Sequence, residues 1–217
     1  MKKQFFLLLA ALLLLPEASA FAQFFADAGY IHAMEIQYNK NTKTGKNHSY
    51  DGAYAGGKFH IDLSSLTDGL ALEPGANMAY LFGKYDYFSD GDIINEYEIT
   101  LNVPFHAQYA LEPSTDFKLY AYAGPTFQYG LWNRGVDGDD NPAMIYNNYK
   151  AIMMPGAPRN TAARNRFNLL LGVGLGMEIS ERVRIGAGYD FGVLNLSTDP
   201  SLRLLRHQFE ISACYIF

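Results

Sequence analysis

The sequence predicts an all-β protein: an eight-stranded antiparallel up-and-down transmembrane β-barrel at residues 23–217, after a signal peptide at residues 1–22. Three observations support this prediction. Apolar residues recur at every second position in eight segments, the period of a strand with one apolar face. Glycines crowd the opposite face of two segments. Aromatic residues gather towards the segment ends.

The N-terminal residues have the pattern of a secretory signal peptide. Lys2 and Lys3 precede an unbroken apolar run over residues 5–15, and two cleavage-type sites with alanine at both ends follow, Ala-Ser-Ala at 18–20 and Ala-Phe-Ala at 20–22. The alternative, a membrane-anchoring helix, would need about 20 apolar residues. The run is shorter than that, so we expect export, with two candidate cleavage sites.

Composition limits the classes of protein that remain. With 18% charged and 49% hydrophobic residues, the chain suits one ordered domain. Loss of Lys2, Lys3 and Glu17 with the signal leaves fifteen basic and twenty-one acidic residues, a net charge of about −6, which argues against a nucleic-acid partner. Cys214 is the single cysteine, so the chain has no internal disulfide.

Each of the eight segments has one apolar parity. The alternation is clearest at residues 97–105, where five apolar residues alternate with Glu98, Thr100, Asn102 and Pro104. In chain order the apolar positions run from Ala28 to Tyr38, Ala53 to Leu63, Leu70 to Phe82, Tyr97 to Phe105, Phe117 to Tyr129, Phe167 to Met177, Val183 to Val193 and Phe209 to Phe217.

The connections between these segments are expected to alternate in length, as hairpins do when one end of a barrel faces the periplasm and the other faces the outside. Short connections are predicted near 64–69, 111–116 and 179–182, and longer ones at 39–50, 84–93, 131–165 and 194–204.

Alternation alone does not say whether the apolar face points into the barrel, as in a soluble barrel or sandwich, or out into lipid. Glycine favours the second interpretation, because it weakens a strand unless space is needed. Gly172, Gly174 and Gly176 would make room inside a narrow barrel for Tyr120 and Tyr122.

Aromatic residues on the apolar face also favour lipid, because amphipathic rings lie at the bilayer boundary. The first and last strands must then pair, because an open sheet edge is not tolerated in hydrocarbon. The two expected girdles contain Tyr38, Tyr97, Tyr129, Phe167 and Phe191 at one end and Tyr30, Phe105, Phe117, Tyr215 and Phe217 at the other.

The chain resembles the OmpA/OmpX-like small outer-membrane barrels, and more closely the porin-family outer-membrane β-barrel proteins common in Bacteroidetes, which include PorT-like proteins. The resemblance covers essentially the whole mature chain. It implies that the alternating C-terminal residues are read by the barrel-assembly machinery. Its motifs are ALEPGANMAYLFGK (71–84), YEITLNVPFHAQYAL (97–111), KLYAYAGPTFQYGL (118–131), RIGAGYDFGVLNLS (184–197) and FEISACYIF (209–217). The residues matching the assembly signal are Phe209, Ile211, Ala213, Tyr215 and Phe217.

Parity also predicts charged side chains inside the barrel. Enclosed charges must be paired or solvated, so we expect a network of ion pairs and waters that fills the lumen. The alternative is an ion or proton path, although side chains fill an eight-stranded barrel. The predicted interior charges are Asp27, Glu35, Lys58, His60, Asp62, Glu96, Glu98, Lys118, Glu178, Arg184, Asp190 and Glu210.

No catalytic site is predicted. Some small barrels cleave lipid with a His–Ser pair oriented by a carboxylate. His32 faces outward by parity, but no serine or carboxylate is expected alongside it, and His207 and Ser212 differ in parity.

No metal or cofactor is expected either. Asp137, Asp139 and Asp140 resemble the start of a calcium loop. Pro142 stands where such a loop needs glycine, and Asn148 replaces the closing glutamate. The apolar stretch 151–155 is expected to dock on a partner or to fold over the barrel mouth.

The sequence therefore predicts a non-catalytic barrel in the outer membrane of a Gram-negative bacterium, with both termini periplasmic and long extracellular loops. Its expected role is in membrane integrity, surface interaction or accessory function. The alternatives are a PorT-like subunit of a secretion apparatus and a narrow porin-like channel. Expected partners are outer-membrane lipid and lipopolysaccharide, the assembly machinery during insertion, and surface or secretion proteins.

Overall fold

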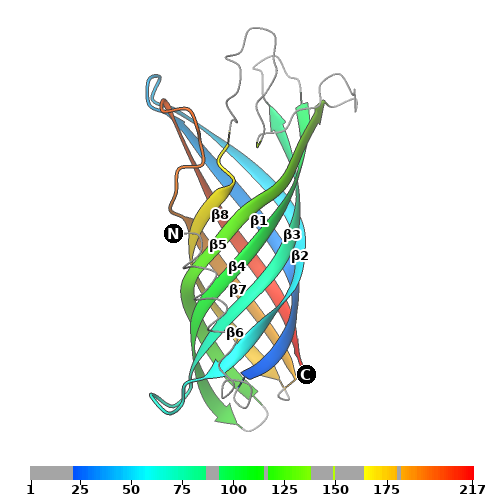
Figure 1. Cartoon of the computed structure of the whole chain (residues 1–217), viewed down its shortest axis with the longest axis vertical. Coiled ribbons are helices and arrows are strands. Elements are labelled where there is room, and N and C mark those ends of the chain that lie inside the picture. Colours follow the sequence, from blue (N-terminus) through cyan, green and yellow to red (C-terminus); the bar gives the residue numbers. More distant parts are fainter. Residues whose placement is uncertain (1–21, 87–92, 115–116, 138–148, 150–163, 180–181) are drawn as a thin grey trace, which may run out of the picture.

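The computed structural model describes residues 22–86, 93–114, 117–137, 149, 164–179 and 182–217. The predicted signal peptide, residues 1–22, lies outside these ranges except for Ala22. Among the described residues, no helix is long and apolar enough to cross a membrane. The predicted fold class is confirmed, because eight antiparallel strands close into one barrel in sequence order (Figure 1). The strands are β1 (Ala22–Asn39), β2 (Thr44–Asp62), β3 (Leu70–Asp86), β4 (Ile93–Ser114), β5 (Phe117–Asp137), β6 (Phe167–Ile179), β7 (Val183–Gly192) and β8 (Leu202–Ile216).

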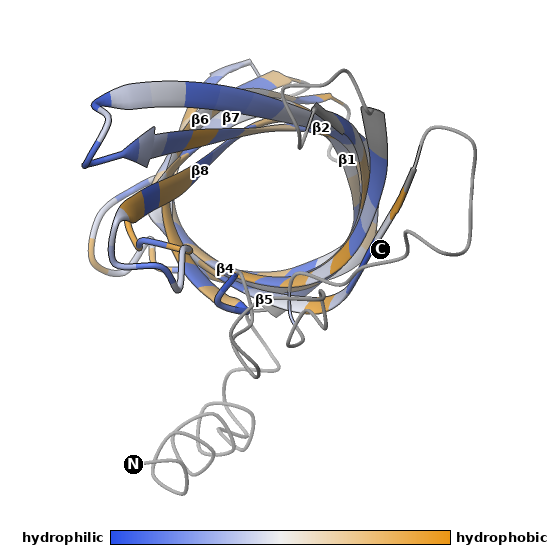
Figure 2. Cartoon of the chain, turned by 90° about the horizontal axis from the view of Figure 1, so that it is seen from above, coloured by the Kyte–Doolittle hydropathy of each residue, from blue (hydrophilic) through white to orange (hydrophobic). Residues whose placement is uncertain are grey.

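Pairing of β8 with β1 closes the ring, which Figure 2 shows from above. The ladder runs from the pair Phe25–Ile216 to the pair Asn39–Leu202. It gives the backbone N–H and C=O groups of both strands a partner, as hydrocarbon requires. The alternating segment at the C-terminus is therefore the strand that closes the barrel wall.

The apolar face points outward. The side chains of Met78, Leu171 and Leu175 are 54%, 50% and 69% exposed, whereas the neighbouring Ala79 and Leu170 are fully buried. The soluble-barrel interpretation would bury the first set, and it is wrong.

Glycines leave room for interior tyrosines, as predicted for two of the three positions. A Cβ atom on Gly174 would overlap the ring of Tyr122, and one on Gly176 would overlap the ring of Tyr120. The expectation for Gly172 is wrong in detail, because the carboxylate of Asp190 occupies the space beside it. These close approaches explain why β6 contains three glycines although glycine normally weakens a strand.

The strands extend beyond the predicted segments, and this corrects the expected connections. Tyr38 pairs with Gly45 and Asn39 with Thr44, so only residues 40–43 join β1 to β2. This connection is shorter than 63–69, which was expected to be one of the short ones. Apolar alternation stops where the wall leaves the bilayer, but the backbone ladder continues because its hydrogen bonds do not depend on which side chains face lipid.

We call the end of the barrel with connections 40–43 and 193–201 the loop end, and the end with connection 63–69 and the C-terminus the turn end. Two residues that we expected in the aromatic girdle at the turn end do not lie there. Tyr30 and Phe105 lie in the middle of β1 and β4. Phe24 marks the turn end of β1 instead, with its ring 5.4 Å from Phe59 and 5.9 Å from Phe217.

Candidate functional site: the charge network inside the barrel

Arg206 of β8 is the centre of a buried ion-pair cluster near the loop end. Its Nε and Nη2 atoms donate to Glu35 Oε1 at 2.9 and 2.6 Å. Its Nη1 and Nη2 atoms donate to the two carboxylate oxygens of Glu98 at 3.0 and 2.5 Å. Arg206 and Glu35 are each 1% exposed, and Glu98 is fully buried. One guanidinium thus ties β8 to β1 and, across the lumen, to β4 with the paired geometry that makes arginine–carboxylate contacts strong.

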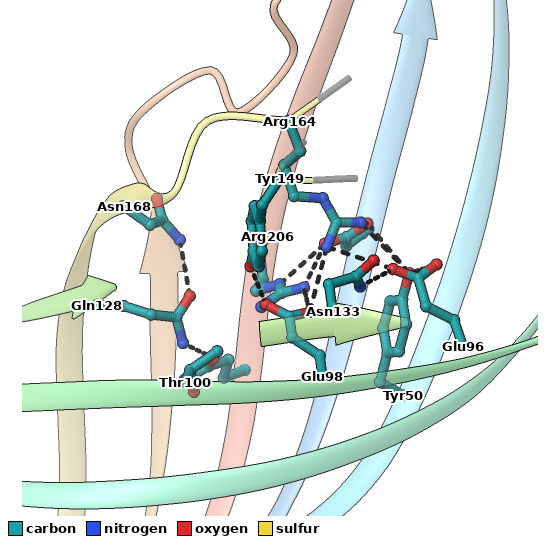
Figure 3. Close-up of polar contacts among 12 residues, drawn as sticks. Tyr50, Glu96, Glu98, Thr100, Gln128, Asn133, Tyr149, Arg164, Asn168 and Arg206 are labelled. Atoms are coloured by element: carbon teal, nitrogen blue, oxygen red, sulfur yellow. Dashed lines mark hydrogen bonds and ion pairs between the residues drawn. The ribbon is translucent and has the colours of Figure 1, made fainter. Parts of the chain in front are cut away.

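Two residues between β5 and β6 also belong to this cluster. Arg164 donates to Glu35 Oε2 at 2.5 Å and to Glu98 Oε2 at 3.1 Å, and its Nη1 lies 3.7 Å from Glu96. The Tyr149 hydroxyl donates to Glu98. Both residues are buried, so this connection reaches into the barrel mouth at these two points (Figure 3).

The loop-end cluster consists of Glu35, Tyr50, Glu96, Glu98, Asn133, Tyr149, Arg164 and Arg206. Tyr50 and Asn133 both bind Glu96, whose carboxylate accepts hydrogen bonds from the Tyr50 hydroxyl at 3.0 Å and from the Asn133 amide. Three glutamates face two arginines, so the formal charge is −1 when all are ionised.

Amide side chains continue the polar filling below the loop-end cluster. Gln128 Nε2 donates to Gln208 Oε1 at 2.7 Å and to Asn102 Oδ1 at 3.0 Å. Asn168 donates to Gln128 at 3.3 Å, and Asn102 donates to Asn77 at 2.8 Å. The five amides come from five different strands. Three of the contacts join partners on neighbouring strands, and the contact between Gln128 of β5 and Gln208 of β8 crosses the lumen.

Glu73 is the centre of a second cluster towards the turn end. Its carboxylate lies 2.5 Å from Arg184 Nη1, 2.9 Å from His60 Nδ1 and 3.2 Å from Lys58 Nζ. Arg184 also donates from Nε to Glu178 at 2.5 Å. The turn-end cluster is Lys58, His60, Glu73, Lys118, Glu178 and Arg184.

Acidic residues and tyrosines occupy the space between the two clusters. The Tyr54 hydroxyl and the Cys214 thiol donate to Asp27 at 3.4 and 3.3 Å. Asp27 and Glu210 line a cavity of about 40 Å³ together with Tyr122. Such a cavity holds about one to three water molecules, and it does not provide a diffusion path for a solute.

The structure places the ten predicted network residues inside the barrel and brings most of them together. Glu35, Glu96 and Glu98 meet in the loop-end cluster; Lys58, His60, Lys118, Glu178 and Arg184 meet in the turn-end cluster; Asp190 and Glu210 lie between them. Asp62, which was also expected inside, is exposed and accepts hydrogen bonds from Ser64 N and Oγ at 2.8 and 3.1 Å. It caps the β2–β3 turn because β2 ends there.

Sequence reasoning missed three central residues. Arg206 shares the interior parity of Gln208 and Glu210, but it precedes the segment where apolar alternation begins. Glu73 has the interior parity of Gly75 and Asn77, so the signal for it was present. Arg164 belongs to a connection with no periodicity, and no sequence signal identifies it.

One expectation about the outer wall is wrong. His32 was expected to have no carboxylate beside it, yet its Nδ1 lies 2.8 Å from Asp51 Oδ1, and the Tyr30 hydroxyl donates to the same oxygen. The pair arises from the β1–β2 register, which places Asp51 opposite His32 and which spacing along one strand does not reveal. No serine, threonine or cysteine among the described residues is hydrogen-bonded to His32. His207 and Ser212 do face opposite sides: His207 packs outside near Phe191, and Ser212 lines the interior cavity.

The remaining predicted sites have less structure to describe. The acidic cluster at Asp139 and Asp140 and the apolar stretch 151–155 lie outside the described residues. Within the described ranges, no group of three or more His, Cys, Asp and Glu side chains is arranged to hold a metal ion. Four residues of the predicted assembly signal, Phe209, Ile211, Ala213 and Tyr215, face outward on the closing strand, and the exposed Phe217 directly follows it.

An outward apolar wall around a polar, ion-paired interior defines the class of protein as an integral membrane β-barrel. A sequence profile of the outer membrane protein beta-barrel domain matches residues 7–217. The chain belongs to this family, which places the protein in the outer membrane of a Gram-negative bacterium.

Several solved structures are similar to this chain at low sequence identity. Neisserial surface protein A is 14% identical with a TM-score of 0.45, and the match covers 90% of this chain and 99% of that one. The Yersinia pestis attachment invasion locus protein Ail, solved with a heparin analogue, is 13% identical with a TM-score of 0.46 and the same coverage. OprG of Pseudomonas aeruginosa is 12% identical with a TM-score of 0.43, covering 90% of this chain and 96% of that one. No curated protein matches the chain.

Proposed function

We propose that this protein is a non-catalytic barrel, closed to solutes, that contributes to membrane integrity and presents its loop end to the cell exterior, with both termini in the periplasm. The observation that carries the proposal is the loop-end cluster. Arg206 and Arg164 join Glu35 and Glu98 across the lumen, and all four side chains are at least nine-tenths buried. A solute crossing the barrel would have to break these contacts.

The outer wall of the barrel supports the non-catalytic part of this proposal. The His32–Asp51 pair could orient a base, but a nucleophile must lie within hydrogen-bond reach of its base. No hydroxyl or thiol among the described residues is hydrogen-bonded to His32, and the nearby Tyr30 hydroxyl donates to Asp51 instead. Orientation follows from connectivity, because β1 and β8 both have their outer chain ends at the turn end. The long connection between β5 and β6, residues 138–166, joins strand ends at the opposite end of the barrel, and outer-membrane barrels have their longer loops outside the cell. This supports placing the turn end, and with it both termini, in the periplasm.

Liposome swelling tests closure. Vesicles that contain the refolded barrel should swell in a small sugar no faster than protein-free vesicles, and faster swelling would favour the narrow channel. Affinity purification from the native membrane tests the accessory role. Stoichiometric recovery of secretion components would instead favour the secretion-subunit alternative.

A further inference from the structure

An external groove lies on the barrel wall near the loop end. Its volume is about 420 Å³, and its described lining residues are Tyr80, Tyr97, Trp132, Arg134 and Val136. They come from the adjacent strands β3, β4 and β5. Small-ligand sites commonly measure about 300–1,000 Å³, so the groove is large enough for one sugar phosphate.

A β-bulge shapes this groove. Ile99 of β4 pairs with Trp132, while Thr100 pairs with Gly130, so Leu131 is the extra residue of β5. Leu131 and Trp132 consequently both face outward, at 40% and 38% exposure. The bulge also shifts the parity that follows: Asn133 turns inward to Glu96, and Arg134 turns outward opposite Tyr97.

The groove combines flat aromatic surfaces with a cation. The Tyr80 and Tyr97 rings lie 6.4 Å apart, and Trp132 comes from the neighbouring strand. Arg134 is exposed and has no ion pair or hydrogen bond from its side chain to any other described residue. An arginine on a lipid-facing wall is unfavourable unless it reaches water or an anion, and its planar fork suits two oxygens of a phosphate.

The position of the groove identifies the kind of anion. Exposed Tyr38, Tyr129 and Phe167 mark the loop end of the apolar wall, where aromatic rings lie at headgroup depth. Trp132 and Arg134 lie at the same end of β5. The anions available at that depth are the phosphates of membrane lipids.

We propose that this groove binds the phosphorylated sugar headgroup of an outer-leaflet glycolipid, with Arg134 on the phosphate and Trp132 against the sugar ring. The proposal requires the barrel to lie in the outer membrane with its loop end outermost. It does not depend on whether the lumen is closed.

Trp132 is the sole tryptophan of the chain, so its fluorescence reports directly on the groove. The mature barrel would be refolded in uncharged polyoxyethylene micelles and titrated with bisphosphorylated lipid A. Parallel titrations would use the same lipid A with its phosphates removed, inorganic phosphate, and glucose 1-phosphate. We expect a saturable change in Trp132 emission with the phosphorylated glycolipid alone at micromolar concentration.

Variants locate the contact. Arg134→Gln should weaken lipid A binding about tenfold or more, the expected loss for a hydrogen-bonded ion contact. Arg203→Gln, which removes an exposed arginine at the loop end of β8, should leave binding unchanged. Heat-modifiable gel migration would confirm that each variant is folded.

Four results would overturn the proposal: no saturable response, equal affinity for lipid A without phosphates, equal affinity of Arg134→Gln, or the same response to inorganic phosphate or glucose 1-phosphate at equal concentration. The last would identify a site for free phosphate compounds. The comparison of the two lipids uses the unaltered protein, so it decides the question even where a variant fails to fold.

Discussion

Replacing Arg206 with methionine tests whether the loop-end cluster holds the barrel together. Arg206 makes four hydrogen bonds to Glu35 and Glu98, and the variant removes them all. Breaking a buried ion pair from one side costs about 3–5 kcal/mol. Arg164 still contacts both carboxylates, so we expect the lower limit, about 3 kcal/mol of unfolding free energy.

Equilibrium unfolding in urea, followed through Trp132 fluorescence in lipid vesicles, measures this loss. Arg203→Met is the matched control, because Arg203 lies three positions earlier on the same strand and is exposed. In a Glu35→Gln, Glu98→Gln background, Arg206→Met should lower the free energy of unfolding by about 1 kcal/mol or less, because no buried carboxylate is then left without a compensating charge. Equal losses for Arg206→Met and Arg203→Met, or the same loss in both backgrounds, would refute the reasoning.

Three further predictions address the rest of the barrel. Gly174→Val should prevent folding, because the valine side chain would overlap the Tyr122 ring. Adding Tyr122→Ala should restore heat-modifiable gel migration in the double variant. If it does not, Gly174 is required for a reason other than space for Tyr122. Deleting residues 136–160 should leave a folded barrel that unfolds at a lower urea concentration, because Glu98 loses the Tyr149 hydroxyl but keeps Arg164 and Arg206. Complete loss of the folded form would instead show that this connection is essential to the fold. Phe217→Ser should lower the amount of barrel in the outer membrane of cells without changing refolding in detergent, and equal losses in both assays would mean that Phe217 acts on stability alone.

The fold was predictable because lipid imposes a simple rule on the sequence. Residues such as Leu171, Val173 and Leu175 must be apolar to face hydrocarbon, so alternation marks the strand and its outward face together. The rule ends where the wall leaves the bilayer. Alternation therefore failed to show that β1 and β2 pair as far as Asn39 and Thr44.

The candidate site was only partly predictable, because its contacts depend on register and on a connection. Parity placed Glu35 and Glu98 inside the barrel, but their shared partner Arg206 lies before the apolar part of β8. Register between strands also brings Asp51 beside His32. Neither relation can be read from the spacing of residues within one strand.

The bulge at Leu131 is the third feature that periodicity alone does not show. It adds one residue to β5 and reverses which side chains face the lumen afterwards. An uninterrupted alternation from Tyr129 would turn Asn133 outward and Arg134 inward. The structure shows the opposite, and the external groove exists for that reason.

Single-channel recording tests the central claim, that ion-paired side chains close the lumen, most directly. The mature barrel would be inserted into a planar bilayer in 1 M KCl and compared with protein-free membranes. Protease protection of the bilayer-embedded strands would verify insertion. We then expect a current no higher than that of the protein-free membrane. Stable conductance steps from the unaltered protein would contradict it, because ions could then pass the contacts between Arg206, Glu35 and Glu98.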